Sequence, residues 1–249
     1  ELTPIFLSCH MDTVEPAEGV RVRREGDLFT SAGDTILGSD DKSGIAACIE
    51  ALRLLRETGT PHRPVELVIT TCEEIGLVGA KALDPKLVRA REGYALDSSG
   101  FARVITHAPA ANRLTITVSG VAAHAGLHPE WGVNAVLVAA QALARVPNGR
   151  IDDETTANFG TIVGGTASNI VPERVVIEAE VRSHSVDKLE RVTRQIEAIF
   201  HETVAAWEDP TGQALGAPSV EVAVRLDFPV MQLDRDDRVI RRVDAAARA

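Results

Sequence analysis

Residues 5–12, IFLSCHMD, decide the fold: a short apolar run of the kind that forms a buried strand ends on a histidine and an aspartate. Residues 65–74 and 93–97 repeat this arrangement, because each begins with an apolar run and ends on acids. A helical pattern that begins at Asp40 and Asp41 separates the first run from the second. Strands that alternate with helices predict an α/β fold with a mostly parallel sheet and helices on both faces.

One histidine and several acids fall where a predicted strand ends or the predicted helix begins. They are His10, Asp12, Asp40, Glu73, Glu74 and Asp97. Because the carboxyl ends of parallel strands share one edge of an open sheet, we expect these side chains to converge on one crevice. Carboxylates gathered there repel one another unless a cation compensates their charge. One histidine with several carboxylates predicts a zinc site, with manganese or cobalt as substitutes.

Each motif alone also has an ordinary structural explanation. Glu73 and Glu74 could form a polar loop, and Asp97 could cap a turn. Asp40 and Asp41 could complement the dipole at the N-terminus of a helix. Only the joint placement of the motifs at strand ends favours a metal site.

The pattern changes from about residue 108 onward. The expected elements are strands at 113–118, 159–163, 175–181 and 220–226, a helix at 132–146, and a long helix for which Ser185 is the predicted N-cap. Their β-α-β-β-α-β order predicts a two-layer, ferredoxin-like α+β domain. We therefore divide the chain into residues 1–107, the first part of the metal-binding catalytic domain; residues 108–227, an inserted domain; and residues 228–249, an incomplete return to the first domain.

Composition restricts the partners and the compartment. The 249 residues are 45% apolar and 25% charged, which is typical of a folded protein. The net charge of −10 and the absence of a basic run argue against a nucleic-acid partner, and no apolar run approaches the roughly 20 residues that span a membrane. Three cysteines without a C-x-x-C pair predict a reducing, cytoplasmic location. The sequence starts at Glu1 and stops within a helical pattern, so we interpret it as a fragment truncated at both ends.

Four motifs in this order resemble a family of two-zinc exopeptidases that includes peptidase T, carboxypeptidase G and the aminoacylases. They are HMDTV at 10–14, GSDDKSG at 38–44, CEEIG at 72–76 and ALD at 95–97. Their wording is most similar to the peptidase T branch, and the resemblance covers nearly the whole chain. It implies a metallopeptidase that hydrolyses short peptides with two zinc ions per subunit, and an inserted domain that serves as a lid and forms a homodimer.

The resemblance also implies a ligand set. His10 and Asp97 would bind the first metal, Glu74 the second, and Asp40 would bridge both. The peptide link between Asp40 and Asp41 would be strained or cis.

Two further acids would act without binding metal. Asp12 would hydrogen-bond the ring of His10 and fix its tautomer. Glu73 would be the general base that accepts a proton from the attacking water and passes it to the leaving amine. Glu73 must stay free for this purpose, because a carboxylate bound to a metal is a poor base.

In the inserted domain the resemblance implies three substrate contacts. His124 would stabilise the oxyanion in a neighbouring subunit, Asn169 would touch the substrate, and Arg182 would bind its terminal carboxylate. The alternatives are a loop histidine beside small residues, a turn residue before a strand, and an exposed arginine in a surface ion pair.

The sequence departs from the family pattern in one respect, because no histidine follows Asp227 to supply the further ligand of the second metal. Within these residues that metal would have only Asp40 and Glu74. Two other functions therefore stay open. One is a related aminoacylase or carboxypeptidase that acts on N-acyl amino acids or dipeptides. The other is a catalytically silent dimerisation or peptide-binding protein.

Overall fold

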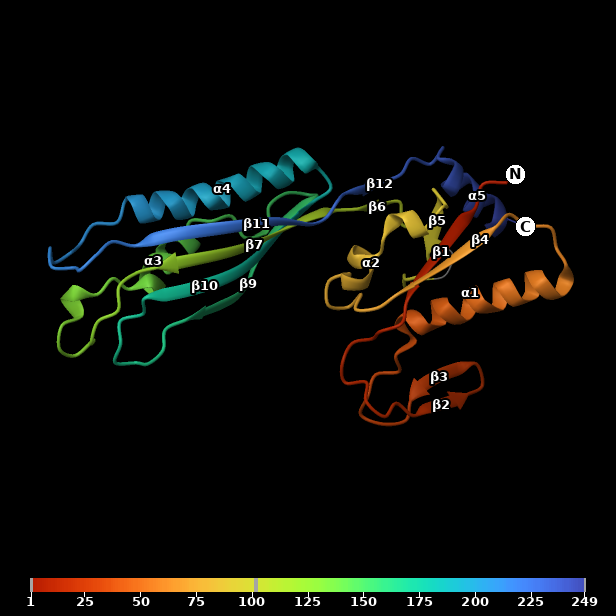
Figure 1. Cartoon of the computed structure of the whole chain (residues 1–249), viewed down its shortest axis with the longest axis horizontal. Helices are drawn as coiled ribbons and strands as arrows, with labels where there is room; N and C mark the ends of the chain where they lie inside the picture. The colour runs from red at the N-terminus through yellow and green to blue at the C-terminus, as the bar shows by residue number, and fades with distance from the viewer. Residues whose placement is uncertain (1, 101–102, 249) are drawn as a thin grey trace. The chain divides into compact units, whose positions relative to one another are not determined.

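The computed structural model describes residues 2–100 and 103–248, which divide into two compact units (Figure 1). Unit 1 contains Glu1–Val104 and Arg235–Ala249, and unit 2 contains Ile105–Asp234. Within the described residues, no helix combines the length and the apolar character needed to cross a bilayer. Each unit is described by itself below.

Unit 1 is built on a three-stranded parallel sheet with the order β4-β1-β5. The central strand β1 (Ile5–His10) pairs with β4 (Val65–Thr70) on one side and β5 (Gly93–Ala95) on the other. His10 lies opposite Thr70, so the chain leaves β1 and β4 at the same edge. The predicted parallel sheet is confirmed, and this edge carries the acids that follow each strand.

Helix α1 (Ser39–Thr58) begins after Gly38 and ends at Gly59, and both glycines adopt a left-handed conformation, with φ of 72° and 60°. Asp40 and Asp41 lie in its first turn but have non-helical backbone angles, and a cis peptide bond joins them. The rest of unit 1 comprises the hairpin of β2 (Val22–Glu25) and β3 (Leu28–Ser31), α2 (Val78–Ala82), the 3-10 turn η1 (Pro85–Leu87) and α5 (Arg238–Ala247).

Unit 2 is an antiparallel sheet with the order β11-β7-β10-β9-β8, and two helices accompany it. Its elements are β7 (Ala110–Ser119), α3 (Ala135–Leu143), β8 (Gly149–Arg150), β9 (Thr155–Gly164), β10 (Arg174–Ser183), α4 (Val186–Ala205) and β11 (Ser219–Phe228). Apart from the short β8, the strands lie side by side in the order fourth, first, third, second. This is the arrangement of a ferredoxin-like domain, so that prediction is confirmed.

The core of unit 2 lies between the sheet and the two helices. Alternate residues of β10, among them Val175, Ile177 and Val181, are fully buried, and so are Ile196 and Phe200 of α4. The intervening residues of β10 face away from this core. Strand alternation therefore gives the sheet one apolar face and one polar face.

Capping side chains set where the two long helices of unit 2 begin. The Asn134 side chain accepts a hydrogen bond from the Leu137 N–H at 3.1 Å, so α3 starts three residues later than the predicted helix at 132–146. Ser185 accepts from the Lys188 N–H at 3.4 Å, and the predicted N-cap of α4 is confirmed. Two more short strands, β6 (His107–Ala108) and β12 (Met231–Gln232), pair with each other, and the turn η2 (Pro129–Trp131) precedes α3.

Candidate metal centre

His10 lies at the centre of the acidic cluster in unit 1. It is the last residue of β1 and only 2% exposed. Its ring nitrogen Nε2 is 3.0 Å from Asp40 Oδ1 and 3.7 Å from Asp97 Oδ1. The same nitrogen is 4.0 Å from Glu73 Oε2. The carboxyl ends of the strands and the start of α1 thus bring the predicted residues to one point.

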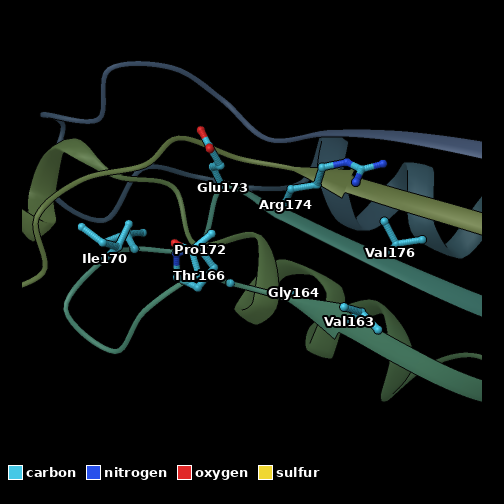
Figure 2. Close-up of a pocket in the computed structure, with 10 residues that line it drawn as sticks. Val163, Gly164, Thr166, Ile170, Pro172, Glu173, Arg174 and Val176 are labelled. Atoms are coloured by element: carbon cyan, nitrogen blue, oxygen red, sulfur yellow. The ribbon is translucent and has the colours of Figure 1, made fainter.

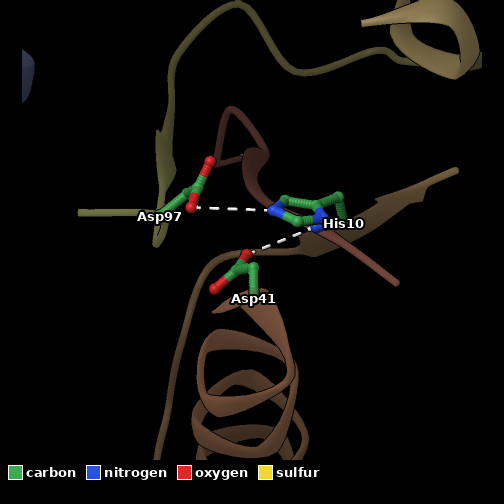
Figure 3. A group of neighbouring side chains, drawn as sticks. All are labelled: His10, Asp41 and Asp97. Atoms are coloured by element: carbon green, nitrogen blue, oxygen red, sulfur yellow. Dashed lines mark hydrogen bonds and ion pairs between the residues drawn. The ribbon is translucent and has the colours of Figure 1, made fainter. Parts of the chain in front are cut away.

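Two overlapping sets of donor atoms could each hold a cation. In one set the ligand atoms of His10, Asp40 and Glu74 lie within 4.8 Å of one another. In the other set the ligand atoms of His10, Asp41 and Asp97 also lie within 4.8 Å of one another. Figure 3 shows these three side chains, which come from β1, from α1 and from the chain after β5. An imidazole nitrogen with carboxylate oxygens is a donor set that suits zinc, so the residues fit the expected metal.

Asp12 holds the loop that carries the two glutamates. Its Oδ1 accepts a hydrogen bond from the Glu73 N–H at 3.0 Å, and its Oδ2 accepts from the Glu74 N–H at 3.2 Å. Its Oδ1 also lies 3.4 Å from His10 Nδ1. Cys72, just before the glutamates, has φ of 55°, a left-handed conformation that is unfavourable for a residue with a side chain. Asp12 therefore stabilises a loop whose backbone carries strain.

The pKa values in the cluster reflect crowded negative charge. Burial, followed by hydrogen bonding to Asp40, raises the pKa of Asp97 to about 6. Burial also raises the pKa of Glu73, against the opposing effect of His10. Burial lowers the pKa of His10, but the hydrogen bond that its ring donates to Asp40 and the negative charge of Asp97 outweigh burial and raise that pKa. A divalent cation would lower these pKa values again, because it stabilises the deprotonated form of its ligands.

Asp12 behaves differently from its neighbours. Burial by itself would raise its pKa, yet the backbone N–H groups of Glu73 and Glu74 outweigh burial and hold the pKa below its usual value. Asp12 therefore stays ionised, which suits an acceptor of two amide hydrogen bonds.

Asp41 is the residue that sequence reasoning missed as a candidate ligand. Its side chain is buried and faces His10 and Asp97, whereas its neighbour Asp40 is exposed. The only signal was the pair of adjacent acids, and nothing in that pair indicates which carboxylate turns inward.

The three candidates in unit 2 fall into two places. His124 forms a β-bridge with Ile170, and the Asn169 carbonyl accepts from the Ala125 N–H at 2.9 Å, so the structure brings His124 and Asn169 together. Arg182 lies near the opposite end of β10 from the Asn169 loop. Its guanidinium pairs with Glu180 at 3.0 Å.

A pocket of about 320 Å³ lies beside the Asn169 loop, at the tip of the β9–β10 hairpin (Figure 2). Its lining is mostly apolar, with two charged residues that are neighbours in the sequence, and comprises Val163, Gly164, Gly165, Thr166, Ile170, Val171, Pro172, Glu173, Arg174 and Val176. All of these residues belong to unit 2, and none of them is a member of the cluster around His10.

Known proteins resemble both units. Residues 110–208 match the peptidase dimerisation domain of M20 peptidases, and residues 2–115 match peptidase family M28. Aminopeptidase PepT from Bacillus cereus is 40% identical, with a TM-score of 0.82 over 99% of this chain and 64% of its own. The chain therefore resembles exopeptidases such as peptidase T and carboxypeptidase G.

Two further relatives match nearly the whole chain. A tripeptidase from Staphylococcus aureus is 36% identical, with a TM-score of 0.84 over 100% of this chain and 64% of its own. The uncharacterized protein YqjE of Bacillus subtilis (strain 168) is 41% identical over 98% of this chain and 63% of its own. The present chain thus spans a little under two thirds of the length of these three relatives.

Proposed function

We propose that the protein is a metal-dependent exopeptidase that hydrolyses amide bonds of short peptides, in the manner of a tripeptide aminopeptidase. The observation that carries the proposal is the convergence of His10, Asp40, Glu74 and Asp97 on one edge of a parallel sheet, with Glu73 beside them. Two relatives of high structural similarity support it, because their names describe an aminopeptidase and a tripeptidase.

In this proposal His10, Asp40, Asp97 and Glu74 hold two divalent cations, with zinc expected and manganese or cobalt as substitutes. Such a pair polarises the scissile carbonyl and lowers the pKa of water. The four side chains keep the ions at the sheet edge.

Glu73 moves the proton. Its burial raises its pKa, so its carboxylate can accept a proton from the attacking water and then donate it to the nitrogen of the departing amine. The reaction consumes one water and leaves Glu73 ionised again. Asp12 fixes the position of Glu73 by accepting a hydrogen bond from the Glu73 backbone N–H. Its Oδ1 lies 3.4 Å from His10 Nδ1 and would also orient the His10 ring.

Residues of unit 2 would supply the substrate contacts. His124 is exposed and could stabilise an oxyanion in the site of a neighbouring subunit, while Asn169 would touch the substrate. Arg182 would bind the terminal carboxylate of the peptide. That carboxylate would replace the Glu180 side chain, which now pairs with the guanidinium through its two oxygens.

A homodimer through unit 2 is the second part of the proposal. The dimerisation domain match covers this unit. From Phe159 onward, β9 has no strand partner on its outer side among the described residues, and Ile162 and Val163 are 55% and 70% exposed. An unpaired edge with exposed β-branched residues favours pairing with another chain. The three cysteines are free thiols in the described part of the chain, which fits the cytoplasmic location included in the proposal.

Glu73→Gln in the full-length protein tests the catalytic role. We expect loss of tripeptide hydrolysis with about two metal ions retained per chain, because glutamine keeps the shape but cannot accept the proton. Glu25→Gln, in the exposed hairpin, is the matched control. Undiminished hydrolysis by Glu73→Gln would remove Glu73 from this role, and absence of metal from the wild type would favour the silent binding protein.

A substrate panel separates the remaining alternatives. Free tripeptides, tripeptides with an acetylated amino terminus, dipeptides and N-acyl amino acids should be compared with the wild type. An aminopeptidase requires the free amino group, so acetylation should abolish turnover. Preferred hydrolysis of N-acyl amino acids, or release of the C-terminal residue, would instead indicate an aminoacylase or a carboxypeptidase.

Val163→Lys tests the dimer. A charge on the open edge of β9 should oppose strand pairing and halve the mass measured by light scattering. Glu190→Lys, on the exposed side of α4, is the control and should retain the wild-type mass. A wild type that sedimented as one chain at micromolar concentration would contradict this part of the proposal.

A further inference from the structure

We propose that Asp41 is a positioning residue of the metal centre: its buried carboxylate fixes His10 against the start of α1 and adds negative charge beneath the cation site. The inference rests on the proposed function, because it assigns a task at the same site. Asp41 is the second of two adjacent aspartates, and the proposed reaction assigns it no role.

Asp40 and Asp41 differ sharply in exposure. The Asp40 side chain is 68% exposed, whereas Asp41 is 2% exposed. Asp41 Oδ2 accepts a hydrogen bond from the backbone N–H of His10 at 3.3 Å, as Figure 3 shows. This bond joins the end of β1 to the start of α1, so a shift of Asp41 would move the backbone that carries the imidazole.

A close approach of three segments encloses the Asp41 carboxylate. A Cβ at Gly44 would lie 2.3 Å from Asp41 Oδ1 and 2.5 Å from the carbonyl oxygen of Leu96. Gly44 is therefore required for α1 to pack against the residue that precedes Asp97. Asp41 thus contacts the segments that carry His10, Asp40 and Asp97, and its position sets the distances among them.

The apolar side of this enclosure is a pair of thiols. Cys9 Sγ and Cys48 Sγ lie 3.6 Å apart, and both residues are buried. Burial, the Cys48 thiol and Asp41 together raise the pKa of Cys9 to about 12, so Cys9 contributes a neutral surface to the enclosure. The Cys9 thiol therefore brings no charge that could balance the carboxylate.

The ionisable groups around Asp41 are the second observation. No lysine or arginine of the described residues forms an ion pair with Asp41, and the nearest ionisable groups include the acids Asp97 and Asp40. A buried carboxylate without a cationic partner is costly. A divalent cation held by His10 and Asp97 would supply that partner, so Asp41 strengthens cation binding through charge as well as through geometry.

The test is titration of metal-free, full-length protein with Co²⁺, followed by the visible absorption of the bound ion. Asp41→Asn keeps an oxygen for the His10 N–H but loses the charge, and Asp41→Ala loses both. We expect Co²⁺ affinity to fall about 10- to 100-fold in Asp41→Ala and by a smaller factor in Asp41→Asn, with altered absorption bands. Asp27→Asn removes the same charge from the exposed β2–β3 turn and should bind like the wild type.

The outcomes separate the two proposals. If the wild type binds no Co²⁺, the proposed function fails. If the wild type binds Co²⁺ and Asp41→Asn binds it with unchanged affinity and spectrum, the role of Asp41 is overturned while the metal centre stands. Because asparagine has the same shape, Asp41→Asn decides the matter even if Asp41→Ala does not fold. Partial recovery in Asp41→Asn relative to Asp41→Ala supports the hydrogen bond to His10, which general destabilisation would not produce.

Discussion

Replacing Asp12 by asparagine should loosen the loop that carries Glu73 and Glu74. Each oxygen of Asp12 accepts one backbone N–H, at 3.0 and 3.2 Å. Asparagine retains one acceptor and turns an NH₂ group toward the other amide, so one charge-assisted hydrogen bond is lost and two donors face each other. Such a bond contributes about 1.5–3 kcal/mol. Because the Asp12 side chain is 24% exposed, we expect a loss of about 2 kcal/mol in the free energy of unfolding of unit 1.

Urea unfolding of the metal-free protein and hydrogen exchange of the two amides measure this effect. The Glu73 and Glu74 amides should exchange faster in Asp12→Asn, and amides in unit 2 should not. Hydrogen bonding lowers the pKa of Asp12 below 3.8, so its stabilising contribution is present above that pH and is lost as the pH falls through the lower, folded-state value. The difference between wild type and variant should therefore shrink in acid.

One result would refute this reasoning. If Asp12→Asn unfolds at the same urea concentration as the wild type at pH 7 and both amides keep their protection, Asp12 does not hold the loop. Asp27→Asn, which removes an equally negative but exposed side chain, gives the reference for nonspecific charge effects.

Three further results are expected. The pKa of Asp97 is raised to about 6, and the pKa values of Glu73 and His10 are also raised, so the folded metal-free protein holds protons that the unfolded chain releases. Thermal denaturation should therefore show stability falling by about 1 kcal/mol from pH 5 to 7, after allowance for solvent screening. Excess Zn²⁺ should reverse this trend. Phe200→Ala should destabilise unit 2 by about 3–5 kcal/mol in urea, since Phe200 is fully buried; an unchanged midpoint would contradict the packing. Ser185→Ala should cost about 1 kcal/mol through loss of the α4 cap, and Ser185→Thr should restore most of it.

The strands and the convergence of the acids could be predicted from local patterns. Buried parallel strands appear in the sequence as apolar runs, and the topology of a parallel sheet places their ends together without further information. The alternation of residues 113–118 in β7 is likewise typical of a strand with one covered face.

Other features leave no local pattern. All four residues of β2 are exposed, so no apolar alternation marks that hairpin. The strands β6, β8 and β12 have two residues each, too few for any periodicity. The burial of Asp41 depends on the packing of Gly44 and Leu96 against it, which only the folded chain specifies.

The short ribbon of β6 and β12 has a practical consequence for engineering. Ala108 pairs with Met231 and His107 with Gln232, so the polypeptide enters and leaves unit 2 through neighbouring strands. Partners across such a ladder have Cα atoms about 5 Å apart. A linker of a few glycines could therefore splice the chain across this point and excise unit 2. The ferredoxin-like module could in turn be expressed alone, or exchanged for that of another protein, without stretching the remaining backbone.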